Sequence, residues 1–169
     1  DPSDVSLTNT DTSPNAAVQF GSTSLTLTEG GSTTTTVVLA SQPTANVTVA
    51  LVAANSSQVA LNPASIVFTP ANWNVPVTIT VTGTNDTVVE ADKTIAISST
   101  ITSLDTKYQA LTPPTISALL HDDDTATITL TAINATQAEG SGSGTTPFTF
   151  RVTSSAAIEG GFQIDFTTN

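Results

Sequence analysis

The segment VPVTITVTGT, from Val75 to Thr84, alternates apolar and hydroxyl-bearing side chains with a period of two. Successive side chains of a β-strand point to opposite faces, so Val77, Ile79 and Val81 share one face and three threonines share the other. Thr makes up about a fifth of the chain, and branched residues suit a pleated surface better than a helix. The pattern predicts an all-β protein whose strands have one buried and one solvated face, with no competing helix.

Short runs of the same kind recur between turn-forming segments such as QPTAN, NPAS, TPANWN and GTND. They predict eight strands, at 17–22, 23–28, 33–40, 47–53, 65–69, 76–82, 94–99 and 115–120. Short strands separated by such turns are typical of an antiparallel β-sandwich of immunoglobulin-like (Ig-like) size, about 100 residues.

Charge excludes several classes of partner. The 169 residues include 14 acids against 3 Lys plus Arg, which gives a formal net charge of −11. Such a surface repels nucleic acid and anionic membranes, and it attracts divalent cations. The absence of cysteine excludes disulfides, thiolate metal sites and thiol catalysis. No apolar run is long enough to span a membrane, and without a starting Met or a signal peptide we expect an internal or processed piece of a longer protein.

An internal repeat sets the expected domain organisation. DVSLTNTD resembles TISALLHD at an offset of 111 residues (4 to 115), and AVQFGSTSLTLTEGG resembles TITLTAINATQAEGS at an offset of 110 (17 to 127). Two nearly equal offsets indicate tandem Ig-like antiparallel β-sandwich domains. We therefore expect the final strand of one repeat at 1–13, a complete sandwich at 14–124 and the first part of a following repeat at 125–169.

Acidic residues fall into three clusters on this sandwich. They are, in chain order, Glu29, then Asp86, Glu90 and Asp92, and finally the run Asp122, Asp123 and Asp124. These seven residues are the candidate metal ligands. The strand order can bring all three clusters to one end of the sandwich. Adjacent carboxylates repel by about 4 kcal/mol near a protein surface, and a bound cation would offset that cost. Calcium takes six to eight oxygen ligands in irregular geometry, whereas zinc is disfavoured because His121 is the chain's one imidazole.

At these residues the sequence resembles the Calx-β domain family and, more loosely, the cadherin-like repeats of large bacterial surface proteins. The motifs that carry the resemblance are TEGG, ITVTGTNDTVVEADKTIAI, FTPANWNVPVTITVTG and TISALLHDDD. It covers residues 17–124, and 126–169 looks like the opening of a second copy. The resemblance implies a Ca²⁺ site where the three acidic segments converge. The residues it nominates are Glu29, Asp86, Glu90, Asp122, Asp123 and Asp124.

Two positions depart from the family pattern. Lys93 stands three residues after Glu90, where Calx-β domains often carry another acid, and the loop AANSSQV lacks the Asp that frequently completes a site. These changes predict fewer or weaker ions. Asn85 and a backbone carbonyl could replace part of the missing coordination.

Three residues suggest other functions, and each has a structural interpretation. Trp73 resembles a sugar-stacking platform, but its place in a turn that enters a strand predicts that it caps the core. Tyr108 is expected to pin a loop through a hydroxyl bond to backbone. His121 has no Ser or Asp partner at a recognisable spacing in the sequence, so no catalytic role is assigned and no enzyme is expected.

Two classes of function remain. The first is an extracellular or cell-surface structural or adhesive array, bacterial in origin, whose joints are stiffened by calcium. Its partners would be neighbouring repeats of the same or identical chains, including a homopolymer, and a surface or matrix ligand. The alternative is a carbohydrate-binding or other ligand-binding module, suggested by threonine rows such as Thr127, Thr129 and Thr131.

Overall fold

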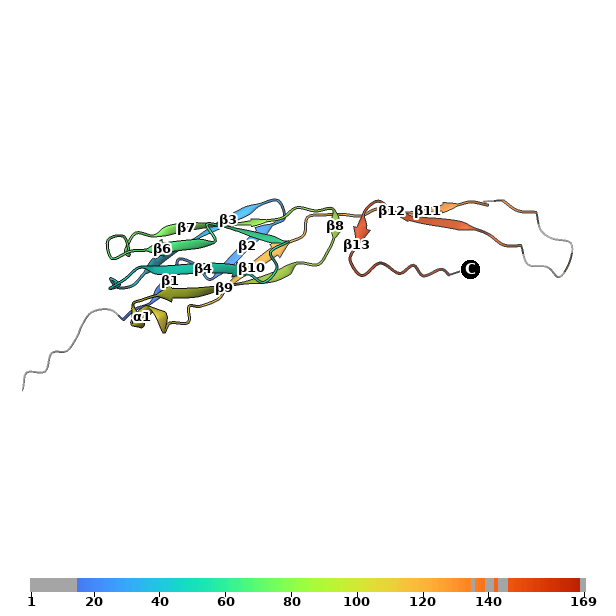
Figure 1. The fold of residues 1–169 in the computed structure, drawn as a ribbon. Helices are drawn as coiled ribbons and strands as arrows, with labels where there is room; N and C mark the ends of the chain where they lie inside the picture. The colour runs from blue at the N-terminus through green and yellow to red at the C-terminus, as the bar shows by residue number, and fades with distance from the viewer. Residues whose placement is uncertain (1–14, 135, 139–141, 143–145, 168–169) are drawn as a thin grey trace, which may run out of the picture.

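A computed structural model of the chain describes residues 15–134, 136–138, 142 and 146–167. It contains short strands and one helical turn, and Figure 1 shows them in chain order. The elements of the sandwich are β1 (Val18–Phe20), β2 (Ser24–Thr28), β3 (Ser32–Leu39), β4 (Val47–Ala53), β5 (Val59–Asn62), β6 (Ser65–Phe68), β7 (Val77–Gly83), β8 (Val88–Val89), β9 (Lys93–Ser103), α1 (Thr106–Gln109) and β10 (Ile116–His121). Beyond it follow β11 (Ile128–Ala132), β12 (Phe150–Ser154) and β13 (Ala157–Ile158).

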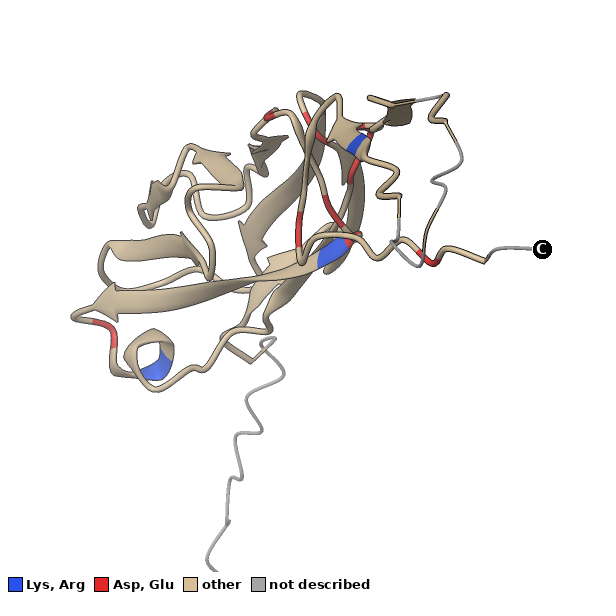
Figure 2. Ribbon diagram, turned by 90° about the vertical axis from the view of Figure 1, so that its right-hand side faces the viewer, with Lys and Arg blue, Asp and Glu red and all other residues tan. Residues whose placement is uncertain are grey.

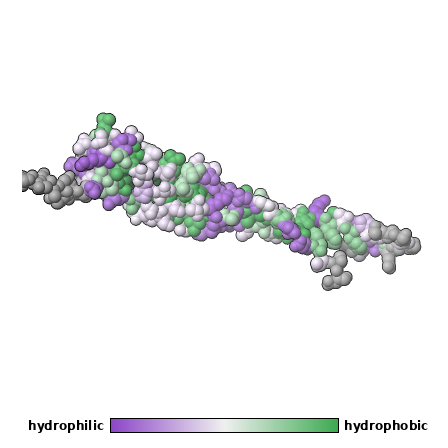
Figure 3. Space-filling model, turned by 90° about the horizontal axis from the view of Figure 1, so that it is seen from below, coloured by the Kyte–Doolittle hydropathy of each residue, from purple (hydrophilic) through white to green (hydrophobic). Residues whose placement is uncertain are grey.

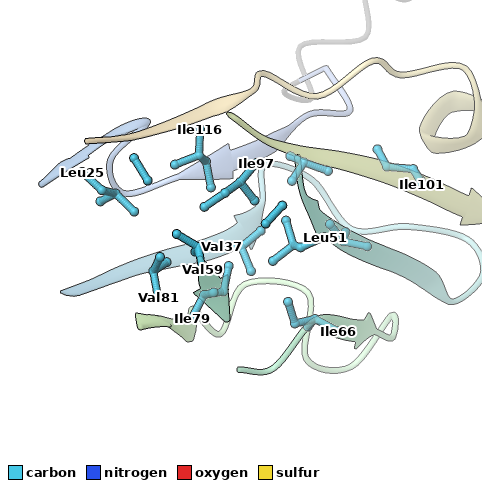
Figure 4. Packing of buried hydrophobic residues seen from close by; sticks show 14 of the residues in the cluster. Leu25, Val37, Leu51, Val59, Ile66, Ile79, Val81, Ile97, Ile101 and Ile116 are labelled. Carbon is cyan, nitrogen blue, oxygen red and sulfur yellow. The ribbon is translucent and has the colours of Figure 1, made fainter. Parts of the chain in front are cut away.

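Two sheets pack face to face and form an Ig-like β-sandwich. One sheet has the order β1-β3-β7-β5, and the other has the order β2-β10-β9-β4-β6. Alternate residues of each strand point into the space between the sheets, as Figure 4 shows for residues such as Val37, Ile79 and Ile97. Burying each such side chain contributes about 1.5–3 kcal/mol, so this apolar layer is what holds the sheets together. The all-β prediction and the sandwich class are confirmed.

The sequence pattern located the long strands well and missed the short elements. All eight predicted strands are present, but β5, β8 and α1 were not expected, and β9 extends to Ser103. The prediction that the chain has no helix was wrong for one turn. That turn forms because the Asp105 carboxylate accepts a hydrogen bond from the Lys107 N–H at 3.0 Å, which caps the helix start.

Within the two sheets of the sandwich, one pair of neighbouring strands departs from the expected antiparallel order. β2 and β10 run parallel, and their register pairs Ser24 with Ser117 and Thr28 with His121. Both strands therefore finish at the same end of the sheet, which places the residues that follow them side by side.

The described residues beyond Asp124 form a hairpin rather than a second sandwich. β11 pairs with β12 in the same way as β1 pairs with β3, since Ile128 opposes Ser154 as Val18 opposes Leu39. The side chains of β11 are exposed, and Figure 3 shows hydrophobic residues on the surface of the hairpin. The exposed large apolar residues here are Ile128, Leu130, Ile133, Phe148, Phe150, Phe162 and Phe166. The described residues contain one complete sandwich, and the assignment of 125–169 to the first part of a following repeat stays a prediction.

Some expectations fall outside the described residues. The predicted final strand of a preceding repeat, at 1–13, and Glu139 of the repeat match both lie there. In the part of the chain that is described, no helix has the length and apolar character needed to cross a membrane.

Candidate metal centre

Glu29 and Asp122 emerge together from neighbouring strands. Because β2 and β10 are parallel, the residues after Thr28 and His121 leave the sheet side by side, and the Glu29 N–H donates to the His121 carbonyl at 3.0 Å. Gly30 then turns the chain with a φ of +65°, a conformation that favours glycine. The TEGG motif is therefore a tight turn that leaves the Glu29 side chain at the end of the sandwich, where it is only 6% exposed.

The second acidic segment reaches the same end from the opposite sheet. β7 ends at Gly83, and the loop after it is fixed by hydrogen bonds to carboxylates of the other clusters. The Asp86 N–H donates to Glu29 Oε2 at 3.3 Å, and the Glu90 N–H donates to Asp122 Oδ2 at 3.1 Å. Residues 57 and 32 positions apart in the sequence are thus in direct contact.

Two sets of three carboxylates converge at this end, which we call the acidic pole. Ligand-capable oxygens of Glu29, Asp86 and Glu90 lie within 4.8 Å of one another, and so do those of Glu29, Asp122 and Asp124. Glu29 belongs to both sets. Figure 2 shows these acidic segments gathered where the sandwich meets the rest of the chain. Five of the seven residues nominated from sequence therefore come together.

Burial and electrostatic repulsion disfavour the ionised form of two carboxyl groups in this cluster. Burial raises the pKa of the Glu29 carboxyl above its ordinary 4.5, and the charges of Asp86, Asp122 and Glu90 raise it further, against the hydrogen bond from Asp86. The pKa of Asp124 is raised as well, first by desolvation and then by its acidic neighbours Asp122 and Asp123. Both carboxylates are harder to ionise here than in water.

Two oxygens at the acidic pole lack the partners that buried polar atoms normally have. Asp122 Oδ1 and Asp124 Oδ2 are shielded from solvent, yet no group among the described residues hydrogen-bonds to either. An unpaired buried carboxylate oxygen is costly, and a cation held by Asp122 and Asp124 would offset that cost. The donor set of hard, anionic oxygens fits calcium or another hard divalent cation.

The side of the acidic pole near Glu90 is already neutralised. Glu90 Oε2 accepts a hydrogen bond from Lys93 Nζ at 2.5 Å and another from Gln58 Nε2 at 3.0 Å. The pKa of Lys93 is raised, chiefly by this hydrogen bond to Glu90. Gln58 comes from the loop AANSSQV, and sequence reasoning did not assign it to the site, because nothing in the spacing links it to Glu90. The unpaired oxygens thus favour the set of Glu29, Asp122 and Asp124 as the place for an ion.

Two nominated residues lie outside both sets. Asp123 is exposed, and Asp92 pairs with His121 at 2.6 Å between Oδ2 and Nδ1. This hydrogen bond is the largest cause that lowers the pKa of Asp92. The sequence shows no partner of His121 at a recognisable spacing, and the structure supplies Asp92, because the pairing of β9 with β10 brings together residues 29 positions apart.

The opposite end of the sandwich carries Trp73 and Tyr108. Trp73 packs against the core, as predicted. Tyr108 is 1% exposed, and its hydroxyl donates to the Ser41 carbonyl at 2.5 Å, so it pins the loop after β3 as predicted. These residues border an open groove of about 890 Å³ together with Gln42, Leu104 and Lys107.

Comparisons with known proteins give general similarities of fold. No protein-family profile and no curated protein matches the sequence. Among solved structures, WR4, a Caenorhabditis elegans MSP family member, is 10% identical with a TM-score of 0.40, covering 63% of this chain and 97% of its own.

Two further solved structures come from bacterial pilus systems. The Salmonella enterica SafA pilin–SafB chaperone complex is 10% identical with a TM-score of 0.43, covering 63% of this chain and 55% of its own. The Acinetobacter baumannii CsuC–CsuE chaperone–tip adhesion subunit complex is 10% identical with a TM-score of 0.45, covering 90% and 89%. At these values the similarity is a general one between β-sandwiches.

Proposed function

We propose that this Ig-like sandwich is a calcium-binding structural module of an extracellular, adhesive or matrix-forming repeat array. The observation that carries the proposal is the convergence of Glu29, Asp122 and Asp124, in which two buried oxygens have no partner among the described residues. A cluster that repels itself and leaves oxygens unpaired is stabilised by a cation. The resemblance to Calx-β domains, at the same residues, supports calcium as that cation.

The carboxylates of the acidic pole provide ligands for few calcium ions. Glu29, Asp122 and Asp124 would hold a calcium ion, and Asp86 would complete its surroundings from the loop after β7. Glu90 is paired with Lys93, which supplies one positive charge of the protein's own. Calcium chemistry here would be structural: the ion neutralises the acidic pole and orders the loops.

The location of the acidic pole explains why such an ion would serve an array. Asp122 to Asp124 directly precede the link to β11, so an ion held by them would fix the direction in which the chain leaves the sandwich. Extracellular modules bind calcium with dissociation constants of about 10⁻⁴–10⁻³ M, matched to calcium outside cells. A module of this kind would stiffen the joint between neighbouring repeats, whose partners are copies of the same domain.

Calorimetric titration of the full chain with calcium tests the proposal. The wild type is expected to bind with a dissociation constant near 10⁻⁴ M, and the double variant Asp122→Asn, Asp124→Asn is expected to lose at least about tenfold in affinity because both unpaired oxygens lose their charge. Asp123→Asn is the matched control, since it removes an adjacent, exposed charge outside both sets. Equal affinities for all three proteins, or no binding by the wild type up to about 10 mM, would contradict the proposal.

A ligand-binding function is the second candidate, and the groove beside Trp73 is the observation that favours it. Saturable binding of an oligosaccharide, lost in Trp73→Ala and kept in the double Asp variant, would establish that alternative. Binding that survives Trp73→Ala would exclude this groove as the ligand site.

A further inference from the structure

The segment that follows the hairpin returns to the acidic pole. β13 pairs in parallel with β8, with Ala157 opposite Val88 and Ile158 opposite Val89. The Glu159 N–H donates to the Val89 carbonyl at 3.0 Å. Figure 1 shows β8 and β13 side by side at the junction between the sandwich and the hairpin. A part of the chain outside the sandwich therefore contacts the loop that carries candidate ligands.

An ion pair reinforces this contact. Lys93 Nζ lies 2.5 Å from Glu90 Oε2 and 3.4 Å from Glu159 Oε2, so one ammonium joins the acidic loop to the returning segment. The hydrogen bonds that Lys93 donates to the two carboxylates raise its pKa, the one to Glu90 more than the one to Glu159. Lys93 is the residue at which the sequence departs from the Calx-β pattern, and its position gives it a role in this contact.

We propose that the acidic loop is the docking surface for the segment Ala157–Glu159, and that docking and cation binding at the acidic pole strengthen each other. This inference rests on the proposed function, because it concerns the same cation site. The occupant of the surface is the returning segment of this chain, which is already paired with β8.

The coupling follows from the position of β8. Val88 and Val89 lie between Asp86 and Glu90, and Asp86 Oδ1 also accepts from the Val88 N–H at 2.7 Å. Pairing of β8 with β13 therefore restrains the backbone on which both carboxylates stand. A loop already ordered by docking pays less conformational entropy when a cation binds, and by reciprocity a bound cation favours docking by the same factor.

The ion pair adds a second link between the two events. Lys93 neutralises Glu90, whose N–H donates to Asp122 Oδ2 of the cation set, and it also lies 3.4 Å from Glu159 Oε2. The Lys93 ammonium thus holds the returning segment without occupying the set of Glu29, Asp122 and Asp124. Docking and cation binding use different carboxylates and do not oppose one another.

The test compares calcium affinity of the full chain with that of variants in the returning segment. Glu159→Pro removes both the N–H that donates to Val89 and the carboxylate that pairs with Lys93, and Glu159→Gln removes only the charge. We expect Glu159→Pro to bind calcium at least about fivefold more weakly, with Glu159→Gln between it and the wild type. Asp165→Asn, an exposed acid bonded to Gln163, is the control of equal charge and is expected to keep the wild-type affinity.

A second measurement uses the unmodified protein. Hydrogen exchange of the Glu159 and Val89 amides should slow several-fold when calcium is added, because a bound cation favours docking. If the wild type binds calcium, and Glu159→Pro binds it equally while exchange at Glu159 is unchanged, the coupling is overturned and the calcium module stands. If the wild type binds no calcium, the proposed function fails, and the coupling fails with it.

Discussion

Glu29 is the carboxylate that both sets of the acidic pole share. It is 6% exposed. Burial, and then the charges of its acidic neighbours, raise its pKa above 4.5. A group whose pKa is raised in the folded state stabilises the fold below its unfolded pKa, and that contribution is lost as pH rises through the folded pKa. Above the folded pKa and without metal, the charge of Glu29 therefore weakens the sandwich.

The change Glu29→Gln reverses the effect of this residue. Gln keeps an oxygen that accepts from the Asp86 N–H and removes the charge, so in EDTA at pH 7 we expect the free energy of unfolding to rise by on the order of 1 kcal/mol. In calcium the same variant should gain less stability than the wild type. Urea unfolding of both proteins in EDTA and in calcium measures this. A variant that is less stable in EDTA, with calcium stabilisation intact, contradicts the role of Glu29.

Asp105 is the counterpart at the other end of the sandwich. It is 6% exposed, and its pKa is lowered below 3.8 mainly by the hydrogen bond from the Thr44 N–H at 2.7 Å, with further bonds from the start of α1. Its contribution to stability is present above the unfolded pKa and is lost as pH falls through the folded pKa.

Asp105→Asn is expected to destabilise the fold in a pH-dependent way. The amide cannot accept from both backbone donors, and leaving the Thr44 N–H unpaired costs about 1–3 kcal/mol at pH 7. As pH falls through and below 3.8, the wild type loses the benefit of the charge and the two proteins converge. Denaturant titrations at pH 7 and at low pH give the difference. A constant difference at both pH values would mean that the charge is not what Asp105 contributes.

Strands and loops differ in how far the sequence predicts them. Period-two runs such as residues 77–82 are set by burial of one face, which the letters show directly, so the long strands were located correctly. β8 depends on a partner far along the chain, Ala157–Ile158, which no local pattern marks. α1 is a single turn, too short to show a helical period, although its cap, Asp105, directly precedes it. At the acidic pole, too, local patterns were predicted and contacts between distant residues were not. Its carboxylates were predicted from composition and motif, whereas Gln58 and the Asp92–His121 pair required the strand register.

Gly83 shows how closely two elements approach at the acidic pole. A Cβ added at this last residue of β7 would meet Leu120 Cδ1 of β10 at 2.7 Å and the Thr28 carbonyl of β2 at 3.0 Å. Gly83→Ala is therefore expected to destabilise the sandwich by about 1–3 kcal/mol. Because Thr28 precedes Glu29, calcium affinity should fall as well. Gly142→Ala, where no atom of the described residues lies within 4 Å of the added Cβ, is the control and should stay within about 0.5 kcal/mol of the wild type in thermal unfolding. Equal effects of the two changes would show that the sheets are not closely packed at Gly83.

At the scale of the whole molecule, the two ends of the sandwich have different chemistry. One end gathers carboxylates and meets the returning segment through β8 and β13, and the other is closed by α1, Tyr108 and Trp73 around a groove. Between the two ends, the outward faces of β3 and β7 carry hydroxyl groups, since Thr34 lies opposite Thr80 on neighbouring strands. A module whose charge is concentrated where the chain continues is suited to a calcium-controlled joint, and this is the central claim of the proposal.

Thermal unfolding of the full chain, in EDTA and in about 1 mM calcium at fixed ionic strength, tests that claim most directly. A single site with a dissociation constant near 10⁻⁴ M adds RT ln(1 + [L]/Kd), about 1.4 kcal/mol, to the free energy of unfolding. For a sandwich of this size the midpoint should rise by about 4–8 °C, and the rise should disappear in the double variant Asp122→Asn, Asp124→Asn. Identical midpoints in EDTA and in calcium would contradict a calcium site at the acidic pole.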